Sequence, residues 1–120
     1  MLNLDTHIIL FAINGTLTTR EKIALDSNEC GISQIVLWEI DKLHGLGRIE
    51  ISLMHSGFID LLRKLIQWPV SLDVCMRLKD LDFRSDPADE IIAATSLAHD
   101  VPLLTRDRKI LASQVVPLAV

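Results

Sequence analysis

Residues 86–107 read DPADEIIAATSLAHDVPLLTRD and combine a helix-start signal with two apolar segments. Asp86 and Pro87 suit the N-cap and first position of a helix, and Asp89 adds the negative charge that a first turn favours. The helix that follows is apolar on nearly every side, so we expect it to be buried. Val101–Thr105 is then a short apolar run of the kind that forms a buried strand. A buried helix leading into a buried strand predicts an α/β fold.

The remainder of the chain repeats this alternation of strand and helix. The other predicted strands are Met1–Leu4, Cys30–Ile32, Val70–Leu72 and Val115–Val120. The predicted helices are Thr6–Ala12, Thr18–Asn28, Ser33–Leu43, Ser52–Gln67, Val74–Leu81, Asp86–His99 and Arg108–Leu111. Such alternation predicts a central parallel sheet with helices on both faces. A length of 120 residues suits one core, so we expect a single domain over residues 1–120.

The overall charge limits the functions that the chain can have. A net charge of −4 argues against a protein that binds nucleic acid through bulk positive charge. It leaves open a nuclease in which acidic residues bind metal ions and local basic groups guide the phosphate backbone. The candidate basic groups are Arg84, Arg106, Arg108 and Lys109, and the alternative for each is a solvated surface charge.

Hydrophobic residues make up 49% of the chain and the mean hydropathy is +0.34, so we expect some apolar surface to be covered by a partner, such as a second copy.

Cys30 and Cys75 have no CxxC spacing and are interpreted as small buried hydrophobes in a reducing cytoplasm. Met1–Asn14 lacks the basic segment of a signal peptide, and no run approaches the roughly 18 apolar residues of a membrane span. We therefore expect a soluble, cytoplasmic protein.

Three carboxylates fall where a parallel sheet would gather them. Asp5 follows the first strand, Asp107 follows the strand Val101–Thr105, and Asp89 lies in a first helical turn that could start at the same edge. Ligands of such sheets bind outside the carboxyl ends of the strands. Each of these acids could instead cap or stabilise a helix start, so none of them decides the function alone.

Glu39 is different because it lies inside the apolar arc of its predicted helix, formed by residues 35, 36, 40 and 43. An isolated buried carboxylate is costly, so it needs either a functional reason or an ion pair with Lys42 or an arginine. If Glu39 joins the other three acids, the group repels itself unless cations neutralise it. Oxygen ligands alone point to Mg²⁺ or Mn²⁺ rather than zinc. Asp86 and Thr105 are supporting candidates, Asp86 as a cap and Thr105 as a sheet residue or a group that orients water.

Other chemistries find no support, because HExxH, GxSxG, P-loop and GxGxxG motifs are absent from the sequence. Two alternatives stay open. One is a Mg²⁺-binding receiver-like signalling domain, although residues 49–57 lack the aspartate that it would need near mid-chain. The other is a non-catalytic module whose acidic pocket only receives a basic peptide.

The segments LDTH (residues 4–7), LWEI (37–40), DPAD (86–89) and LLTRD (103–107) together resemble PIN-domain proteins, in particular VapC-type toxin ribonucleases. They occur in the family's order and span nearly the whole chain. The resemblance implies an α/β/α sandwich and a Mg²⁺- or Mn²⁺-dependent endoribonuclease that acts as the toxin of a toxin–antitoxin pair. It also implies an RNA substrate, a cognate antitoxin and a homodimer. By position, the family's acidic residues match Asp5, Glu39, Asp89 and Asp107, and a small hydroxyl residue matches Thr105.

Overall fold

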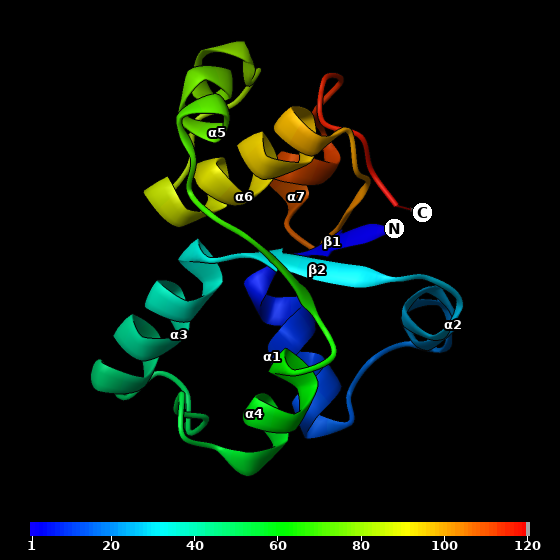
Figure 1. Cartoon of the computed structure of the whole chain (residues 1–120), viewed down its shortest axis with the longest axis vertical. Coiled ribbons are helices and arrows are strands. Elements are labelled where there is room, and N and C mark those ends of the chain that lie inside the picture. The colour runs from blue at the N-terminus through cyan, green and yellow to red at the C-terminus, as the bar shows by residue number, and fades with distance from the viewer. Residues whose placement is uncertain (120) are drawn as a thin grey trace.

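The computed structural model describes residues 1–119 and is built on a four-stranded parallel sheet (Figure 1). The strands are β1 (Leu2–Leu4), β2 (Cys30–Ser33), β3 (Ile66–Trp68) and β4 (Leu103–Leu104). They lie in the order β3-β2-β1-β4. β1 and β2 are short and buried along their whole length, which fits their central positions in the sheet.

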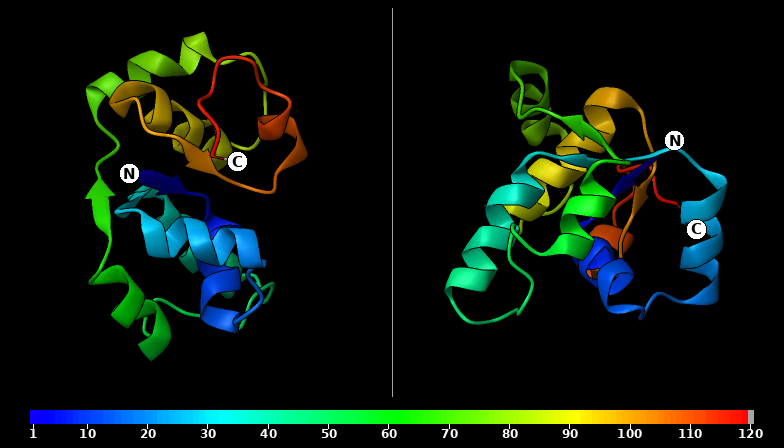
Figure 2. Two further views of the ribbon diagram at one scale, coloured as in Figure 1. Left: turned by 90° about the vertical axis from the view of Figure 1, so that its right-hand side faces the viewer. Right: turned by 60° about the horizontal axis from the view of Figure 1, so that its bottom comes forward.

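Helices cover both faces of this sheet. They are α1 (Thr6–Asn14), α2 (Thr19–Ser27), α3 (Ile35–Gly45), α4 (Ser56–Leu62), α5 (Leu72–Arg77), α6 (Pro87–His99) and α7 (Arg108–Leu111), with a 3-10 turn, η1, at Leu78–Asp80. Figures 1 and 2 show α5, α6 and α7 on one side of the strands and α1, α3 and α4 on the other. The predicted α/β/α sandwich with a central parallel sheet is therefore confirmed.

A buried side-chain amide fixes α6 against the central strand. Asn3 of β1 is fully buried, and its Nδ2 donates hydrogen bonds to the Ile92 carbonyl at 3.0 Å and to the Ser96 hydroxyl at 2.9 Å. Ile92 is itself fully buried against the core. Because a buried polar group is stabilising only when it is hydrogen-bonded, these contacts favour one position of α6 over the sheet.

The third strand differs from the sequence prediction. The predicted strand Val70–Leu72 is wrong, and Ile66–Trp68 forms β3 instead. The predicted helix Ser52–Gln67 shrinks to α4, which ends at Leu62. Residues 66–68 pair with residues 31–33 of β2, so a contact that is distant in sequence overrides the local helical pattern.

Gly31 explains how β3 fits against β2. A Cβ atom on Gly31 would lie 2.7 Å from carbon atoms of the Trp68 ring, so the missing side chain leaves room for the indole. The residues predicted as a strand instead lead into α5, whose start is capped by Ser71: its hydroxyl accepts a hydrogen bond from the Val74 amide at 3.2 Å.

The C-terminal segment also departs from the prediction of a strand over Val115–Val120. Up to residue 119 it makes a single parallel bridge, Leu103 to Leu118, flanked by two backbone hydrogen bonds of 2.9 Å. Val120 lies outside the described residues.

Cys30 is buried as predicted, whereas Cys75 is exposed, so the prediction for Cys75 is wrong. Within residues 1–119, no helix has the length and apolar character needed to cross a membrane.

Candidate active site

The site lies where the direction of the strand order reverses. The chain proceeds from β1 to β2 and β3 on one side, and β4 returns to the other side of β1. Asn3 and Leu4 pair with Leu103 and Leu104, so the carboxyl ends of β1 and β4 are adjacent. Such a switch point forms the crevice that binds ligands in open α/β sheets. Asp5 follows β1 at this crevice, and residues 105–107 follow β4.

Asp5 is both a helix cap and a member of the acidic edge. Its carboxylate accepts a hydrogen bond from the Thr6 amide at 2.8 Å and another from the Thr105 hydroxyl at 2.5 Å. The side chain is buried, and this burial raises the pKa of Asp5 above its ordinary value, although the two hydrogen bonds oppose the shift. The nearby charge of Asp107 raises the pKa further.

Glu39 projects from α3 toward the same edge and is half-buried. It accepts a hydrogen bond from the Thr6 hydroxyl. The alternative of an ion pair is wrong for the part of the chain described here, because neither ion pair found there involves Glu39. Burial raises the pKa of Glu39, and the negative charges of Asp89 and Asp5 raise it further.

Asp89 lies in the first turn of α6 and accepts a hydrogen bond from the Ser85 hydroxyl at 2.9 Å. Burial is again the main cause that raises its pKa, and Asp5, Asp107 and Asp86 add to the effect. Asp86 occupies the N-cap position as predicted, but its side chain makes no capping hydrogen bond.

Asp107 completes the acidic edge from the loop after β4. It is the N-cap of α7, and its Oδ1 accepts hydrogen bonds from the amides of Lys109 and Ile110 at 2.9 and 3.2 Å. Its own amide donates to the Thr105 hydroxyl at 3.0 Å. Thr105 therefore links Asp107 to Asp5, the two acids that follow the neighbouring strands.

The structure thus brings the four predicted acids to one edge, where their charges act on one another. Among residues 1–119, however, no three His, Cys, Asp or Glu side chains converge on a single metal position. Mg²⁺ is usually bound through only one or two carboxylates and keeps several waters, so it does not require such convergence. A set of carboxylates whose pKa values are raised by burial and mutual repulsion fits a hard divalent cation.

Hydroxyl groups orient three of the four acids, and the sequence pointed to only one of these hydroxyls. Thr105 was the predicted one, whereas Thr6 and Ser85 were missed. A local signal was present for both: Thr6 directly follows Asp5, and Ser85 directly precedes the predicted cap of the helix that carries Asp89.

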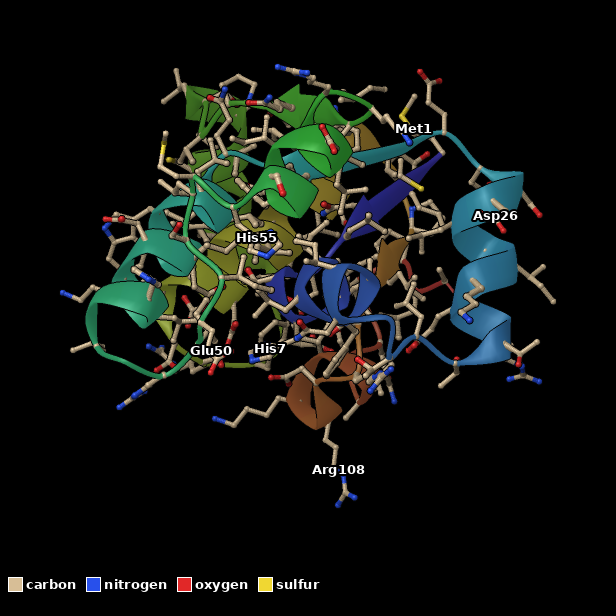
Figure 3. The ribbon with its side chains drawn as sticks, turned by 90° about the horizontal axis from the view of Figure 1, so that it is seen from below. Met1, His7, Asp26, Glu50, His55 and Arg108 are labelled. Atoms are coloured by element: carbon tan, nitrogen blue, oxygen red, sulfur yellow. The ribbon has the colours of Figure 1, made fainter. Side chains whose placement is uncertain are left out.

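Arg106 is already engaged within the protein. Its guanidinium donates to the Glu21 carboxylate at 2.6 and 2.8 Å and to the Thr16 carbonyl at 3.2 Å. It also lies 3.8 Å from the centre of the Phe11 ring. Arg106 is therefore not a free cation for phosphate, unlike the exposed Arg108 that projects from α7 in Figure 3.

The fold is an α/β/α sandwich around a parallel sheet, with four acidic residues near the switch point of that sheet. Residues 3–114 match the family model described as PIN domain, and the chain belongs to this family. PIN domains are generally nucleases and generally use divalent metal ions. No curated protein matches the sequence.

Solved structures share the fold over nearly the full length of the chain. VapBC2 from Rickettsia felis, bound to a promoter DNA fragment, aligns with a TM-score of 0.76 and 22% identity over 99% of this chain and 98% of that one. DNA-bound VapBC from Salmonella typhimurium aligns with a TM-score of 0.72 and 18% identity over 98% and 96%. FitAcB from Neisseria gonorrhoeae aligns with a TM-score of 0.65 and 20% identity over 99% and 97%.

Proposed function

We propose that this protein is a Mg²⁺- or Mn²⁺-dependent endoribonuclease and the toxin of a toxin–antitoxin pair. One observation carries the proposal: Asp5, Glu39, Asp89 and Asp107 come from four separate segments and gather at one edge of the sheet, where burial and mutual repulsion raise three of their pKa values. Acids whose pKa values are shifted by burial and by neighbouring charges in a crevice are typical of functional sites. Membership of a family of nucleases supports the same conclusion.

In this proposal Asp5 and Asp89 hold the cation directly, and Glu39 and Asp107 complete its surroundings directly or through water. When bound, a divalent ion lowers the pKa of water and stabilises negative charge on phosphoryl oxygens. The protein's contribution is to keep the carboxylates ionised and oriented. The hydroxyls of Thr105, Thr6 and Ser85 serve this purpose, because a hydrogen bond donated to a carboxylate favours its charged form.

The first test compares induced expression of the wild type and Asp5→Asn in a bacterial host, following growth and total RNA. Asparagine can still cap α1, so the variant should fold while losing a metal ligand. Asp26→Asn changes an exposed carboxylate of α2 and is the matched control. We expect the wild type and Asp26→Asn to arrest growth and cut RNA, and Asp5→Asn to do neither.

A second test uses purified protein and labelled RNA with Mg²⁺, with Mn²⁺ or with EDTA. Cleavage that needs the metal and Asp5 supports the nuclease. Binding of a basic peptide without any metal-dependent cleavage would instead favour the non-catalytic acidic pocket. Labelling of the protein by acetyl phosphate would favour the receiver-like alternative.

The partners belong to the same proposal. The structural relatives include toxin–antitoxin complexes, which supports a cognate antitoxin for this chain. A homodimer is supported by exposed apolar side chains such as Leu72 and Met76 on α5, which are 77% and 54% exposed. Light scattering of the purified protein would measure its mass in solution. The two free cysteines are consistent with action in the cytoplasm. The same proposal treats residues 1–120 as one domain.

A further inference from the structure

The acidic edge opens beside α1 into a depression of about 240 Å³. Asp5, Arg106 and Asp107 line it together with His7 and Phe11. His7 is exposed in the first turn of α1 and packs against Phe11 with ring centres 6.3 Å apart. The two rings therefore form a wall next to the carboxylates.

A second and larger depression shares this wall. His7 and Phe11 also line this groove of about 440 Å³, which continues to Arg48 and Glu50 in the segment after α3, with the buried Ile51 among its apolar residues. Figure 3 shows His7 of α1 and Glu50 of this segment lying close together on the same side of the molecule. The groove and the depression at the acidic edge are therefore neighbours that share His7 and Phe11.

The groove has the chemistry that a nucleotide requires. Its volume lies within the range of about 300–1,000 Å³ that small-ligand sites occupy. Aromatic rings provide stacking surfaces for unpaired bases, and an arginine binds backbone phosphate. A glutamate accepts hydrogen bonds from the exocyclic amino group of a base. The exposed His7, Arg48 and Glu50 supply these three elements in one groove, beside Phe11, whose ring also lies against Arg106.

An exposed cation is available to a polyanion in this groove. Arg106, which adjoins Asp107 and lines the depression at the acidic edge, is neutralised by Glu21. Arg48 is exposed and takes part in neither of the ion pairs found within residues 1–119. A phosphate chain that leaves the edge past His7 therefore meets an available cation at Arg48.

We propose that this groove holds the nucleotide next to the cleaved phosphate of a single-stranded RNA. The base stacks against the wall of His7 and Phe11, the neighbouring phosphate contacts Arg48, and Glu50 reads the edge of the base. This subsite rests on the ribonuclease function proposed above and adds to it a preference for one base beside the cut. The shared wall places the groove directly beside the acidic edge, which favours RNA over a partner peptide as the occupant.

Binding is measured first, in EDTA, so that the RNA is not cut. The probe is a fluorescein-labelled eight-nucleotide single-stranded RNA of mixed sequence, followed by anisotropy at several salt concentrations. Arg48→Gln should weaken binding and reduce the slope of log affinity against log salt by about 0.7, the value for one phosphate contact on a single strand. Arg63→Gln changes an exposed arginine after α4 that does not line the groove, and it should change neither quantity.

Stacking is tested by two substitutions of His7 in the same assay. His7→Ala should weaken binding by about fivefold or more, whereas His7→Phe keeps an aromatic ring and should retain most of the affinity. A purely structural role of His7 would not distinguish these two variants by RNA affinity, because the residue is exposed.

Base reading is tested by cleaving a randomised RNA pool with Mn²⁺ and sequencing the new ends. Glu50→Gln should change the base preference at one position beside the cut, relative to the wild type and Arg63→Gln.

If all variants bind and cut as the wild type does, the groove has another occupant, such as a partner peptide, and the subsite is refuted while the nuclease stands. If RNA binds through Arg48 and His7 but is cut with neither metal, the nuclease fails, and the groove is an RNA-binding surface rather than a subsite beside a cut. Absence of RNA binding by the wild type refutes the subsite.

Discussion

Arg106 and Glu21 form a two-point ion pair, with hydrogen bonds of 2.6 and 2.8 Å, that ties the loop after β4 to α2. Arg106 stands between Thr105 and Asp107, which both belong to the acidic edge. The pairing holds the pKa of Glu21 at about 2, below its ordinary value of 4.5, chiefly because the carboxylate accepts hydrogen bonds from Arg106. This ion pair therefore fixes the position of a loop that carries part of the candidate site.

Glu21→Gln should lower the free energy of unfolding at neutral pH by about 1–2 kcal/mol, since the pair is only partly buried and water screens it. Because the folded protein has the lower pKa, this stabilisation is complete above about pH 4.5 and is lost as the pH falls toward 2. Urea unfolding of the wild type and the variant at several pH values measures the difference, which should shrink over that range.

The matched control is Asp26→Asn, an exposed carboxylate on the same helix, which should leave the unfolding free energy within about 0.5 kcal/mol of the wild type. A difference between wild type and Glu21→Gln that stays constant from pH 7 to pH 3 would show that the charge of Glu21 is not the cause.

Glu39→Gln should make the protein more stable at neutral pH in EDTA, by about 0.5–2 kcal/mol, while abolishing cleavage. The folded-state pKa of Glu39 is raised, mainly by burial, so its ionised form opposes folding as the pH rises above the ordinary value of 4.5. Glutamine keeps an oxygen that accepts the Thr6 hydrogen bond and removes the charge. Thermal unfolding at pH 5 and pH 8 measures the effect, which should be larger at pH 8.

The same variant separates a metal site from a structural carboxylate. A divalent ion that binds only the folded state stabilises it by about 2.7 kcal/mol at a concentration of 100 times its Kd. Mn²⁺ should therefore raise the unfolding midpoint of the wild type more than that of Glu39→Gln. An equal rise in both proteins would remove Glu39 from the proposed metal site.

The four acids could be proposed as candidate site residues from the sequence because each has a local signal. Asp5 and Asp107 follow apolar runs that become strands, and Asp89 follows a helix-start signal. Glu39 was recognisable because a charge inside an apolar arc has few structural explanations. The α/β/α arrangement followed from the alternation of strand and helix, which is also a local property.

Features created by tertiary contacts could not be predicted in the same way. Residues 66–68 continue a helical pattern in sequence and become a strand only because β2 offers them a partner. The ion pair of Arg106 joins residues 85 positions apart, so no spacing rule indicates it. Arg106 was interpreted as a surface cation or a phosphate contact for that reason.

Gly31→Ala should destabilise the protein by about 1–3 kcal/mol, the usual effect of overfilling a well-packed site. The added methyl group would lie 2.7 Å from the Trp68 ring and 2.9 Å from the Ile66 carbonyl oxygen, so β3 would have to move. Gly45→Ala is the control, because nothing lies within 4 Å of a Cβ at that helical position. Chemical unfolding of both variants is the measurement, and equal stabilities would contradict the close contact of Trp68 with β2.

Thr105→Val removes a hydroxyl that donates to Asp5 and accepts from the Asp107 amide, with little change in side-chain shape. Loss of these buried hydrogen bonds should lower the free energy of unfolding by about 1–3 kcal/mol. The hydrogen bond from Thr105 also lowers the pKa of Asp5, so its removal should raise that pKa further. As the pH is lowered, cleavage that needs ionised Asp5 should therefore be lost at a higher pH in Thr105→Val than in the wild type.

Thr105→Ser keeps the hydroxyl and distinguishes orientation of Asp5 from simple packing. A serine hydroxyl can still donate to the Asp5 carboxylate and accept from the Asp107 amide. Thr105→Ser should therefore restore the acidic limb of the pH–rate profile, even though the missing methyl group lowers stability. Cleavage of a labelled RNA by the three proteins between pH 5 and pH 8 gives the profiles. If valine and serine shift the acidic limb equally, Thr105 acts through packing. If only valine shifts it, the hydroxyl of Thr105 sets the protonation state of Asp5.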